Sequence, residues 1–380
     1  MRIAMLGHKR IPSREGGVEI VVEELASRMT SKGHDVTVYN RKGHHVSDKT
    51  KKDVGQKKYD YEGIHIITVP TFEKKSLNAI VYAFLATWHA AFGNYDVIHY
   101  HAEGSCAMLP VAKLFGKRTV ATIHGLDWQR AKWGGFATKF LRFGEKMAAK
   151  YADEVIVLSR GVQQYFMETY GRGTKYIPNG ITKPEMRSAN LITEKYGLCG
   201  QDYILFLARL VPEKGVHYLI EAYRELETDK KLVIAGGSSH SDEYMKQIEE
   251  MAGTDSRIMM TGFVEGRELE ELYSNCALYV LPSDIEGMPI SLLEAMSYGR
   301  KCLVSNIAEN MEVVEDMAVG FRKSDVADLS EKLRLILEEI EQNVDGETGI
   351  NRYRDEDIQN FVLARYDWDA IVERTLQLYE

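Results

Sequence analysis

The sequence has few of the residues that cross-link small or secreted proteins. Its four cysteines, at positions 106, 199, 276 and 302, are scattered through 380 residues. A structural zinc site or a redox pair needs cysteines only a few residues apart. This spacing argues against both kinds of site, and we expect reduced thiols.

Long apolar runs and an excess of positive charge are also missing. No segment approaches the roughly 20 apolar residues that a membrane-spanning helix needs. The formal net charge is −8 at pH 7, whereas general nucleic-acid binding needs clustered cations. We therefore expect a cytoplasmic protein without a signal peptide, a transmembrane anchor or a nucleic-acid partner.

The sequence does contain an alternation of short β-branched runs and amphipathic stretches. This pattern is typical of parallel sheets covered by helices. One series of expected strands covers residues 2–6, 35–39, 65–69, 97–101, 119–124 and 154–158, and a second covers 203–208, 231–235, 257–261, 278–281 and 301–305. We predict an α/β protein with two doubly wound, Rossmann-like domains, which suits the chain length.

The pattern pauses near residues 176–181 and resumes after a polar stretch that ends near residue 196. We place the N-terminal domain at 1–181 and the C-terminal domain at 182–365. A last helix, 366–380, has the apolar spacing to pack back on the first domain. Ligands of open parallel sheets lie beyond the carboxyl ends of the strands. We therefore expect the site in a central cleft, lined by residues that follow strands.

Two segments that follow strands carry groups that suit phosphate. Gly16 and Gly17 open a helix, and paired glycines let backbone N–H groups approach an anion; a simple tight turn is an equal alternative. Arg209 and Lys214 follow a strand, where the forked guanidinium of an arginine and the compact ammonium of a lysine suit a diphosphate. A solvated surface pair is the alternative. The G-x-G-x-x-G fingerprint and the P-loop are both absent from the sequence.

The most informative stretch is 283–297. Glu286 and Glu294 are eight positions apart, across a loop and the start of a helix, so one can face a sugar while the other meets a ribose. Residues 287–291 are expected at the helix N-terminus, where free N–H groups and the helix dipole favour phosphate.

In this order, the glycine pair, Arg209 with Lys214, and the Glu-x7-Glu segment resemble the retaining GT-B glycosyltransferases of family 4 over essentially the whole chain. The resemblance implies that the glycines approach the donor diphosphate, Arg209 and Lys214 neutralise it, Glu286 contacts the sugar and Glu294 holds the ribose. It also implies that the donor nucleotide is bound by Gly262, Phe263, Val264, Gly287, Met288, Ile290 and Ser291. Core packing is the alternative for Phe263, and Pro289 lacks an N–H that many relatives offer to phosphate.

His124, within residues 122–127, resembles the family's histidine beside the reacting carbon and would position the sugar. Together with Glu286, Arg209 and Lys214 it forms the expected catalytic set. His99 and His101 have no such match and are interpreted as packing or acceptor-side residues. The family pattern also implies attack by the acceptor from the leaving-group face.

Residues 125–134, with 7–12, resemble a subgroup of rhamnosyltransferases of bacterial capsule, exopolysaccharide or cell-wall synthesis. We expect Trp128, Arg130 and Lys132 to bind the acceptor. The favoured donor is dTDP-rhamnose, with UDP-glucose, UDP-GlcNAc or another UDP-sugar as the alternative. The acceptor is expected to be a saccharide or a polyprenyl-diphosphate-linked glycan.

Residues 133–150 carry aromatic side chains at helical spacing beside cations, which suits an anionic membrane surface or, equally, a core-facing stripe. Asp367-Trp368-Asp369 matches the metal-binding D-x-D of a different glycosyltransferase fold. Its place at the start of the last helix favours an N-cap for Asp367 instead, and we predict neither a metal nor another cofactor.

Other classes of protein share this fold pattern. A nicotinamide-dependent oxidoreductase would need the missing glycine fingerprint, and a glycan phosphorylase would need a pyridoxal phosphate lysine segment that we do not find. A nucleotide-sugar epimerase remains a minor alternative. A non-catalytic nucleotide-sugar-binding protein would keep the same pockets, and only turnover separates it from an enzyme.

Overall fold

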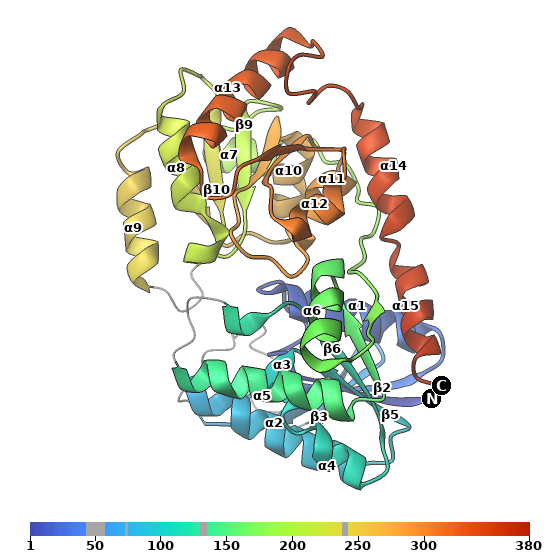
Figure 1. The fold of residues 1–380 in the computed structure, drawn as a ribbon. Helices are drawn as coiled ribbons and strands as arrows, with labels where there is room; N and C mark the ends of the chain where they lie inside the picture. The colour runs from blue at the N-terminus through green and yellow to red at the C-terminus, as the bar shows by residue number, and fades with distance from the viewer. Residues whose placement is uncertain (43–57, 73–74, 130–134, 238–241) are drawn as a thin grey trace. The chain divides into compact units, whose positions relative to one another are not determined.

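The chain folds into two compact units in a computed structural model that describes residues 1–42, 58–72, 75–129, 135–237 and 242–380. One unit comprises Met1–Gly180 with Trp368–Glu380, and the other comprises Ile181–Asp367. Each unit has its own sheet with helices packed against it (Figure 1). The predicted α/β class with two Rossmann-like folds is confirmed.

The first unit is built on a mainly parallel sheet. Its described strands are β1 (Arg2–Leu6), β2 (Asp35–Arg41), β3 (Lys58–Tyr61), β4 (Ile64–Val69), β5 (Val97–His101), β6 (Arg118–Ile123), β7 (Glu154–Val157) and β8 (Lys175–Tyr176). They lie in the order β3-β4-β2-β1-β5-β6-β7-β8, with β3 antiparallel to β4. Its described helices are α1 (Gly17–Ser31), α2 (Lys75–Phe92), α3 (Glu103–Cys106), α4 (Leu109–Leu114), the 3-10 turn η1 (Asp127–Gln129), α5 (Gly135–Tyr151), α6 (Arg160–Tyr170) and α15 (Trp368–Gln377).

The strand order of the first sheet reverses at β1, which has β2 on one side and β5 on the other. Loops at such a switch point border the ligand crevice of doubly wound sheets. Gly7 follows β1 with a φ of +120°, and a Cβ there would lie 1.9 Å from the carbonyl oxygen of His101 at the end of β5. Only glycine allows this close approach.

The second unit has an all-parallel sheet over its described strands: β9 (Tyr203–Leu207), β10 (Lys231–Ala235), β11 (Ile258–Gly262), β12 (Leu278–Leu281), β13 (Cys302–Ser305) and β14 (Val319–Phe321). Their order is β11-β10-β9-β12-β13-β14, so the switch point lies between β9 and β12. Its described helices are η2 (Pro212–Lys214, a 3-10 turn), α7 (Leu191–Tyr196), α8 (Val216–Arg224), α9 (Asp242–Ala252), α10 (Gly266–Asn275), α11 (Ile290–Ser297), α12 (Ala308–Val314), α13 (Val326–Gln342) and α14 (Asp355–Arg365).

Each sheet buries alternate side chains against a helical layer. In the first unit, Ala4 and Leu6 of β1 share a buried cluster with Tyr82 of α2. In the second, Ile204 and Phe206 of β9 share one with residues of α8, α9 and α13. The intervening strand residues are buried as well. The central strands β1 and β9 are therefore covered on both faces, which explains their nearly continuous apolar sequences.

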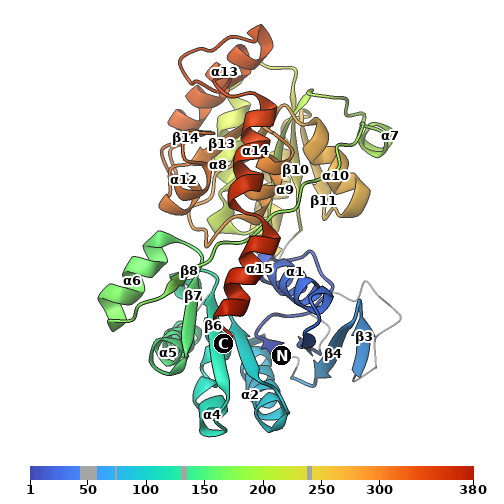
Figure 2. The same ribbon diagram turned by 90° about the vertical axis from the view of Figure 1, so that its right-hand side faces the viewer.

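The last helix, α15, belongs to the first unit and packs on α1 (Figure 2). Arg28 pairs with Asp369 at 3.2 Å, and Lys32 pairs with Glu373 at 2.7 Å. Beyond the helix, the hydroxyl of Tyr379 lies 2.6 Å from Nδ1 of His99. The helix begins at Trp368, two residues later than the sequence predicts.

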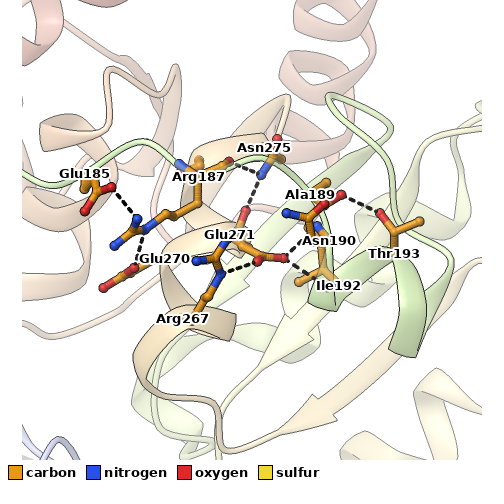
Figure 3. Close-up of polar contacts among 11 residues, drawn as sticks. Glu185, Arg187, Ala189, Asn190, Ile192, Thr193, Arg267, Glu270, Glu271 and Asn275 are labelled. Atoms are coloured by element: carbon orange, nitrogen blue, oxygen red, sulfur yellow. Dashed lines mark hydrogen bonds and ion pairs between the residues drawn. The ribbon is translucent and has the colours of Figure 1, made fainter.

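A buried carboxylate ties the start of the second unit to α10 (Figure 3). Glu271 is fully buried and accepts hydrogen bonds from the backbone N–H groups of Asn190 and Ile192, at 2.9 and 3.3 Å, and from Arg267 at 3.0 Å. Burial raises the pKa of Glu271, but these bonds outweigh burial and hold it below its usual value. Glu271 therefore caps the first turn of α7 from a distant element.

Candidate functional site

The loops that follow β9 and β12 meet at the switch point of the second unit. There the ammonium of Lys214 lies 2.5 Å from Oε1 of Glu286. Both side chains are largely buried, with 14% and 6% of their surfaces exposed. An ion pair with so little solvent contact is screened much less than a surface pair. Two residues that the sequence analysis assigned to the donor site therefore form one charged unit.

A glycine makes this approach possible. Gly215, directly after Lys214, has a φ of +68°, and a Cβ there would lie 2.0 Å from the carbonyl oxygen of Pro282. The two loops are also joined by a 2.9 Å hydrogen bond from the N–H of Asp284 to the carbonyl oxygen of Glu213. Gly215 is absent from the predicted site; its position directly after a basic residue, in the loop that follows a predicted strand, is the signal that could have identified it.

Arg209 lies on the same loop, directly beyond β9, and is half-buried. The N–H of the next residue, Leu210, donates to the carbonyl oxygen of Gly237 at 3.0 Å. The loop is thus fixed on the β10 side as well as the β12 side. Arg209 and Lys214 both lie in the loop at the carboxyl end of β9, as predicted.

The start of α11 is held by two buried tyrosines. The hydroxyl of Tyr279 donates to Oγ of Ser291 at 2.8 Å, and that of Tyr273 donates to Oε2 of Glu294 at 3.0 Å. Burial, and then the neighbouring Glu294 carboxylate, raise the pKa of Tyr273 well above its usual value. Tyr273 is therefore a permanent donor at neutral pH, which fixes one oxygen of Glu294.

The other residues that the sequence predicts to bind the donor lie on two loops. Gly287, Met288 and Ile290 are buried around the N-cap residue of α11, Pro289. Gly262 ends β11 with a φ of +72° and open space where a Cβ would stand, Phe263 is half-buried, and Val264 is buried. Half-burial of Phe263 is compatible with both interpretations, contact with the donor nucleotide and core packing.

In the first unit, Gly16 is the N-cap of α1 and Gly17 is its first residue. A Cβ at Gly16 would lie 2.3 Å from a carboxylate oxygen of Glu19. Glu19 is buried and accepts the N–H of Lys9 at 2.9 Å. Burial raises its pKa, but the bond from Lys9 and nearby positive charge outweigh that effect and lower it overall. A carboxylate of this chain therefore occupies the first turn of the helix where we predict phosphate.

His124 follows β6 and is buried with 8% of its surface exposed. Its Nε2 lies 3.1 Å from Nδ1 of His101, a fully buried residue. His101 in turn lies against His99, with ring centroids 4.2 Å apart. From the sequence, His124 is predicted to be catalytic and His101 to be a packing or acceptor-side residue; their contact could not be predicted, because contacts between neighbouring strand ends cannot be read from spacing along the chain.

Trp128 lies in η1, and its indole N–H donates to the buried carboxylate of Glu145 at 3.0 Å. Arg142 lies over its ring, 4.6 Å from the centroid. Arg130 and Lys132 lie outside the described residues. The Trp128 N–H is thus engaged within the chain, and the ring is held by a neighbouring helix.

Asp367 and Asp369 flank Trp368, a residue buried to 3% exposure at the start of α15. Asp369 pairs with Arg28. Among the residues with described positions, no cluster of three or more His, Cys, Asp or Glu side chains has a geometry that could hold a metal ion. None of the described helices is long and apolar enough to cross a membrane.

Comparison with known families matches both units. Residues 15–183 match the model described as Glycosyltransferase Family 4, and residues 190–352 match Glycosyl transferases group 1. The chain is 34% identical over 262 residues to an alpha-D-kanosaminyltransferase of Streptomyces kanamyceticus, covering 62% of this chain and 67% of the relative. The chain belongs to the GT-B glycosyltransferases.

Two further similarities to this glycosyltransferase are informative. An Escherichia coli UDP-Gal:alpha-D-GlcNAc-diphosphoundecaprenol alpha-1,3-galactosyltransferase is 27% identical over 242 residues, which cover 60% of this chain and 62% of the relative. The Anabaena protein HepE, solved in complex with UDP and glucose, matches with a TM-score of 0.78 and 19% identity over 99% of this chain and 98% of that one. At that identity, the structural match shows the shared fold alone.

Proposed function

We propose that this glycosyltransferase moves a hexose or deoxyhexose from a nucleoside diphosphate sugar to a glycan or lipid-linked acceptor, with retention at the anomeric carbon and without a metal. The observation that carries the proposal is the Lys214–Glu286 pair at the switch point, with Arg209 on the same loop. Cations fixed beside a leaving diphosphate stabilise the charge that develops on it, usually the largest catalytic contribution.

The ion pair suits this task because each of its members can bind a different part of the donor. A diphosphate offers the Lys214 ammonium a stronger anionic partner than one carboxylate oxygen. Glu286 is then left with acceptor oxygens for sugar hydroxyl groups. Glu294 accepts a hydrogen bond from Tyr273 through one oxygen, which fixes the carboxylate that we propose as the ribose ligand.

The test compares Lys214→Ala with Lys195→Ala. Lys195 also pairs with a glutamate, Glu268, at 2.5 Å within the same unit, but 52% of its side chain is exposed. We expect Lys214→Ala to lower kcat/KM on the order of 100- to 1000-fold, the size of the loss when one preorganised hydrogen-bond donor is removed. Lys195→Ala should stay within about threefold of the wild type, because exposed pairs contribute little. Equal turnover of the two variants would refute the assignment.

The donor is identified by a thermal-shift panel of dTDP-, UDP- and GDP-sugars, with and without EDTA. The sequence resemblance favours dTDP-rhamnose, and the names of the galactosyltransferase and of the HepE complex support a UDP-hexose. A ligand at 100 times its Kd stabilises the folded state by about 2.7 kcal/mol. EDTA should leave the shift unchanged, and an EDTA-sensitive shift would contradict the metal-free proposal.

The anomeric configuration of the product, read by proton NMR, tests retention.

We further propose that α5 brings this enzyme to an anionic membrane surface, as a lipid-linked acceptor would require. Phe136 and Phe143 are 71% and 48% exposed, whereas Leu141 is buried toward the core. The exposed side also carries Lys139, Arg142, Lys146 and Lys150, and the acidic residue of this helix, Glu145, is fully buried. Exposed aromatics among cations are typical of helices that lie in a membrane interface.

Vesicle co-sedimentation tests this contact with a matched pair of variants. Phe136→Ser should lower binding to phosphatidylglycerol vesicles by roughly fivefold or more, since even partial burial of a phenyl ring contributes about 1 kcal/mol. Phe92→Ser, on α2, removes a ring of the same 71% exposure and should not change binding. Equal effects of the two substitutions, or equal binding to neutral vesicles, would refute α5 as the contact surface.

A further inference from the structure

The rings of His99, His101 and His124 form a row in the first unit, and His101 contacts both of the others. His101 is fully buried, and its Nδ1 lies 3.1 Å from Nε2 of His124. The other ring nitrogen of His101, Nε2, is buried and has no hydrogen-bond partner. The contact between Nδ1 of His101 and Nε2 of His124 has room for one proton, so one ring must donate there and the other must accept.

The backbone of His101 is held tightly. Its carbonyl oxygen accepts the hydroxyl of Ser105 at 2.8 Å, and Gly7 approaches the same oxygen so closely that no side chain fits there. The next residue, Ala102, has a φ of +67°, a region that non-glycine residues rarely occupy. Strain of this kind persists where surrounding contacts fix the chain, and it is concentrated at functional sites.

The ring of His101 is held as well. It lies against the ring of His99 with centroids 4.2 Å apart. His99 is itself bonded on both nitrogens, by Nδ1 to the hydroxyl of Tyr379 at 2.6 Å and by Nε2 to that of Thr122 at 2.7 Å. His101 therefore presents Nδ1 to His124 in one orientation.

When both rings are neutral, two proton arrangements are possible. If His124 donated from Nε2, the proton of His101 would sit on its unpartnered Nε2, leaving a buried N–H without an acceptor. If His101 donates from Nδ1, only a lone pair is left unpaired at that position. Orphaned buried N–H groups are rarer in proteins than under-used acceptors. The second arrangement is favoured, and burial, followed by the neighbouring His99 and His124 rings, keeps His101 neutral by holding its pKa well below 6.5.

We propose that His101 is a positioning residue that donates from Nδ1 to Nε2 of His124 and so holds His124 as its Nδ1–H tautomer. The tautomer of a histidine is set by the hydrogen bond that its other nitrogen makes. The Nδ1 of His124 is then a hydrogen-bond donor and cannot accept a proton. This inference rests on the proposed role of His124 beside the transferred sugar, and it narrows that role to donation toward a sugar oxygen.

The first test is the NMR spectrum of the wild-type protein with 15N-labelled histidine, with His124 assigned by the loss of its signals in His124→Gln. We expect a protonated, pyrrole-like Nδ1 and an unprotonated, pyridine-like Nε2. The opposite tautomer, or a doubly protonated ring at pH 7.5, would overturn the inference. Because this readout needs no substrate, it stands or falls separately from the proposed transfer activity.

The second test is kinetic. His101→Phe removes the donor, and we expect kcat to fall on the order of 10- to 100-fold, as when a supporting contact is lost, with the donor KM nearly unchanged. His101→Asn keeps an N–H close to the position of Nδ1 and should recover most of the loss. His65→Phe, the same change at an exposed histidine of β4, is the control. Equal losses in His101→Asn and His101→Phe, or a loss confined to KM, would indicate packing alone and refute the positioning role.

Discussion

Replacing Gly215 by alanine tests whether the close approach of two loops shapes the proposed donor site. The new Cβ would lie 2.0 Å from the carbonyl oxygen of Pro282, and real Cβ atoms essentially never come within 3.0 Å of another heavy atom. The loops must therefore separate by about 1 Å, because the two nearest atoms, the carbonyl oxygen and carbon of Pro282, belong to the backbone and cannot rotate away. Lys214 and Glu286 stand on these two loops, and their 2.5 Å contact should open.

The expected cost has two parts. An alanine at a φ of +68° costs about 1–2 kcal/mol, and overpacking adds about 1–3 kcal/mol. The second unit should thus lose about 2–5 kcal/mol of stability, and kcat/KM should fall roughly 100-fold, as for a catalytic group displaced by about 1 Å. Gly197→Ala is the matched control, because Gly197 has a φ of +62° but its nearest neighbour, Nζ of Lys231, lies 3.9 Å away.

The assay can separate the two units. The tryptophans at described positions, Trp88, Trp128 and Trp368, belong to the first unit, so tryptophan fluorescence in urea should report the same unfolding midpoint for the wild type and both variants. Hydrogen exchange of peptides from the second unit measures the loss itself. The reasoning is refuted if Gly215→Ala is no less stable than Gly197→Ala and keeps the wild-type kcat/KM.

Three further predictions concern buried polar groups. The pKa of Glu271 is held below 4.5 in the folded state. Its ionised carboxylate therefore stabilises the second unit above that pH, and this stabilisation is lost as pH falls through the folded pKa. Glu271→Gln should flatten the decline of the second unit's urea midpoint below pH 4.5, and an unchanged profile would contradict this. Tyr379→Phe removes the bond to His99 and should destabilise the first unit by about 1 kcal/mol, lowering its Tm by a few degrees in calorimetry; no change would contradict a bond there. Trp128→Phe leaves one carboxylate oxygen of buried Glu145 without its hydrogen-bond donor and should lower the free energy of unfolding by about 1–3 kcal/mol. Circular dichroism, which does not depend on the tryptophan signal, measures this loss. An unchanged free energy of unfolding would indicate that Trp128 serves only to bind a ligand.

Much of the fold could be predicted because fully buried parallel strands are continuous apolar runs. The strand at residues 2–6 was predicted with the bounds that β1 has. The edge strands β3, β8 and β14 were not predicted. Each has two to four residues, and β3 and β8 carry lysine and tyrosine side chains that are partly exposed, so they lack the apolar run that marks an inner strand.

The site was predicted less completely, and the reason is geometric. Arg209, Lys214 and Glu286 are charged residues that follow strands, so they can be recognised from the sequence alone. Gly215 and His101 act through neighbours on other strands, at separations that only the strand order sets. The expectation for residues 16 and 17 could not include Glu19, whose carboxylate turns back onto its own helix start.

The return of residues 368–380 to the first unit has a consequence for biosynthesis. The ring of Trp368 packs against Gly180, where an added Cβ would lie 2.3 Å from it, and Tyr379 closes over His99. A ribosome therefore releases the last pieces of the first unit only after it has made the whole second unit. The N-terminal unit must wait in an incomplete state during elongation, and an early stop codon that spares every residue of the second unit would still leave the first one unfinished.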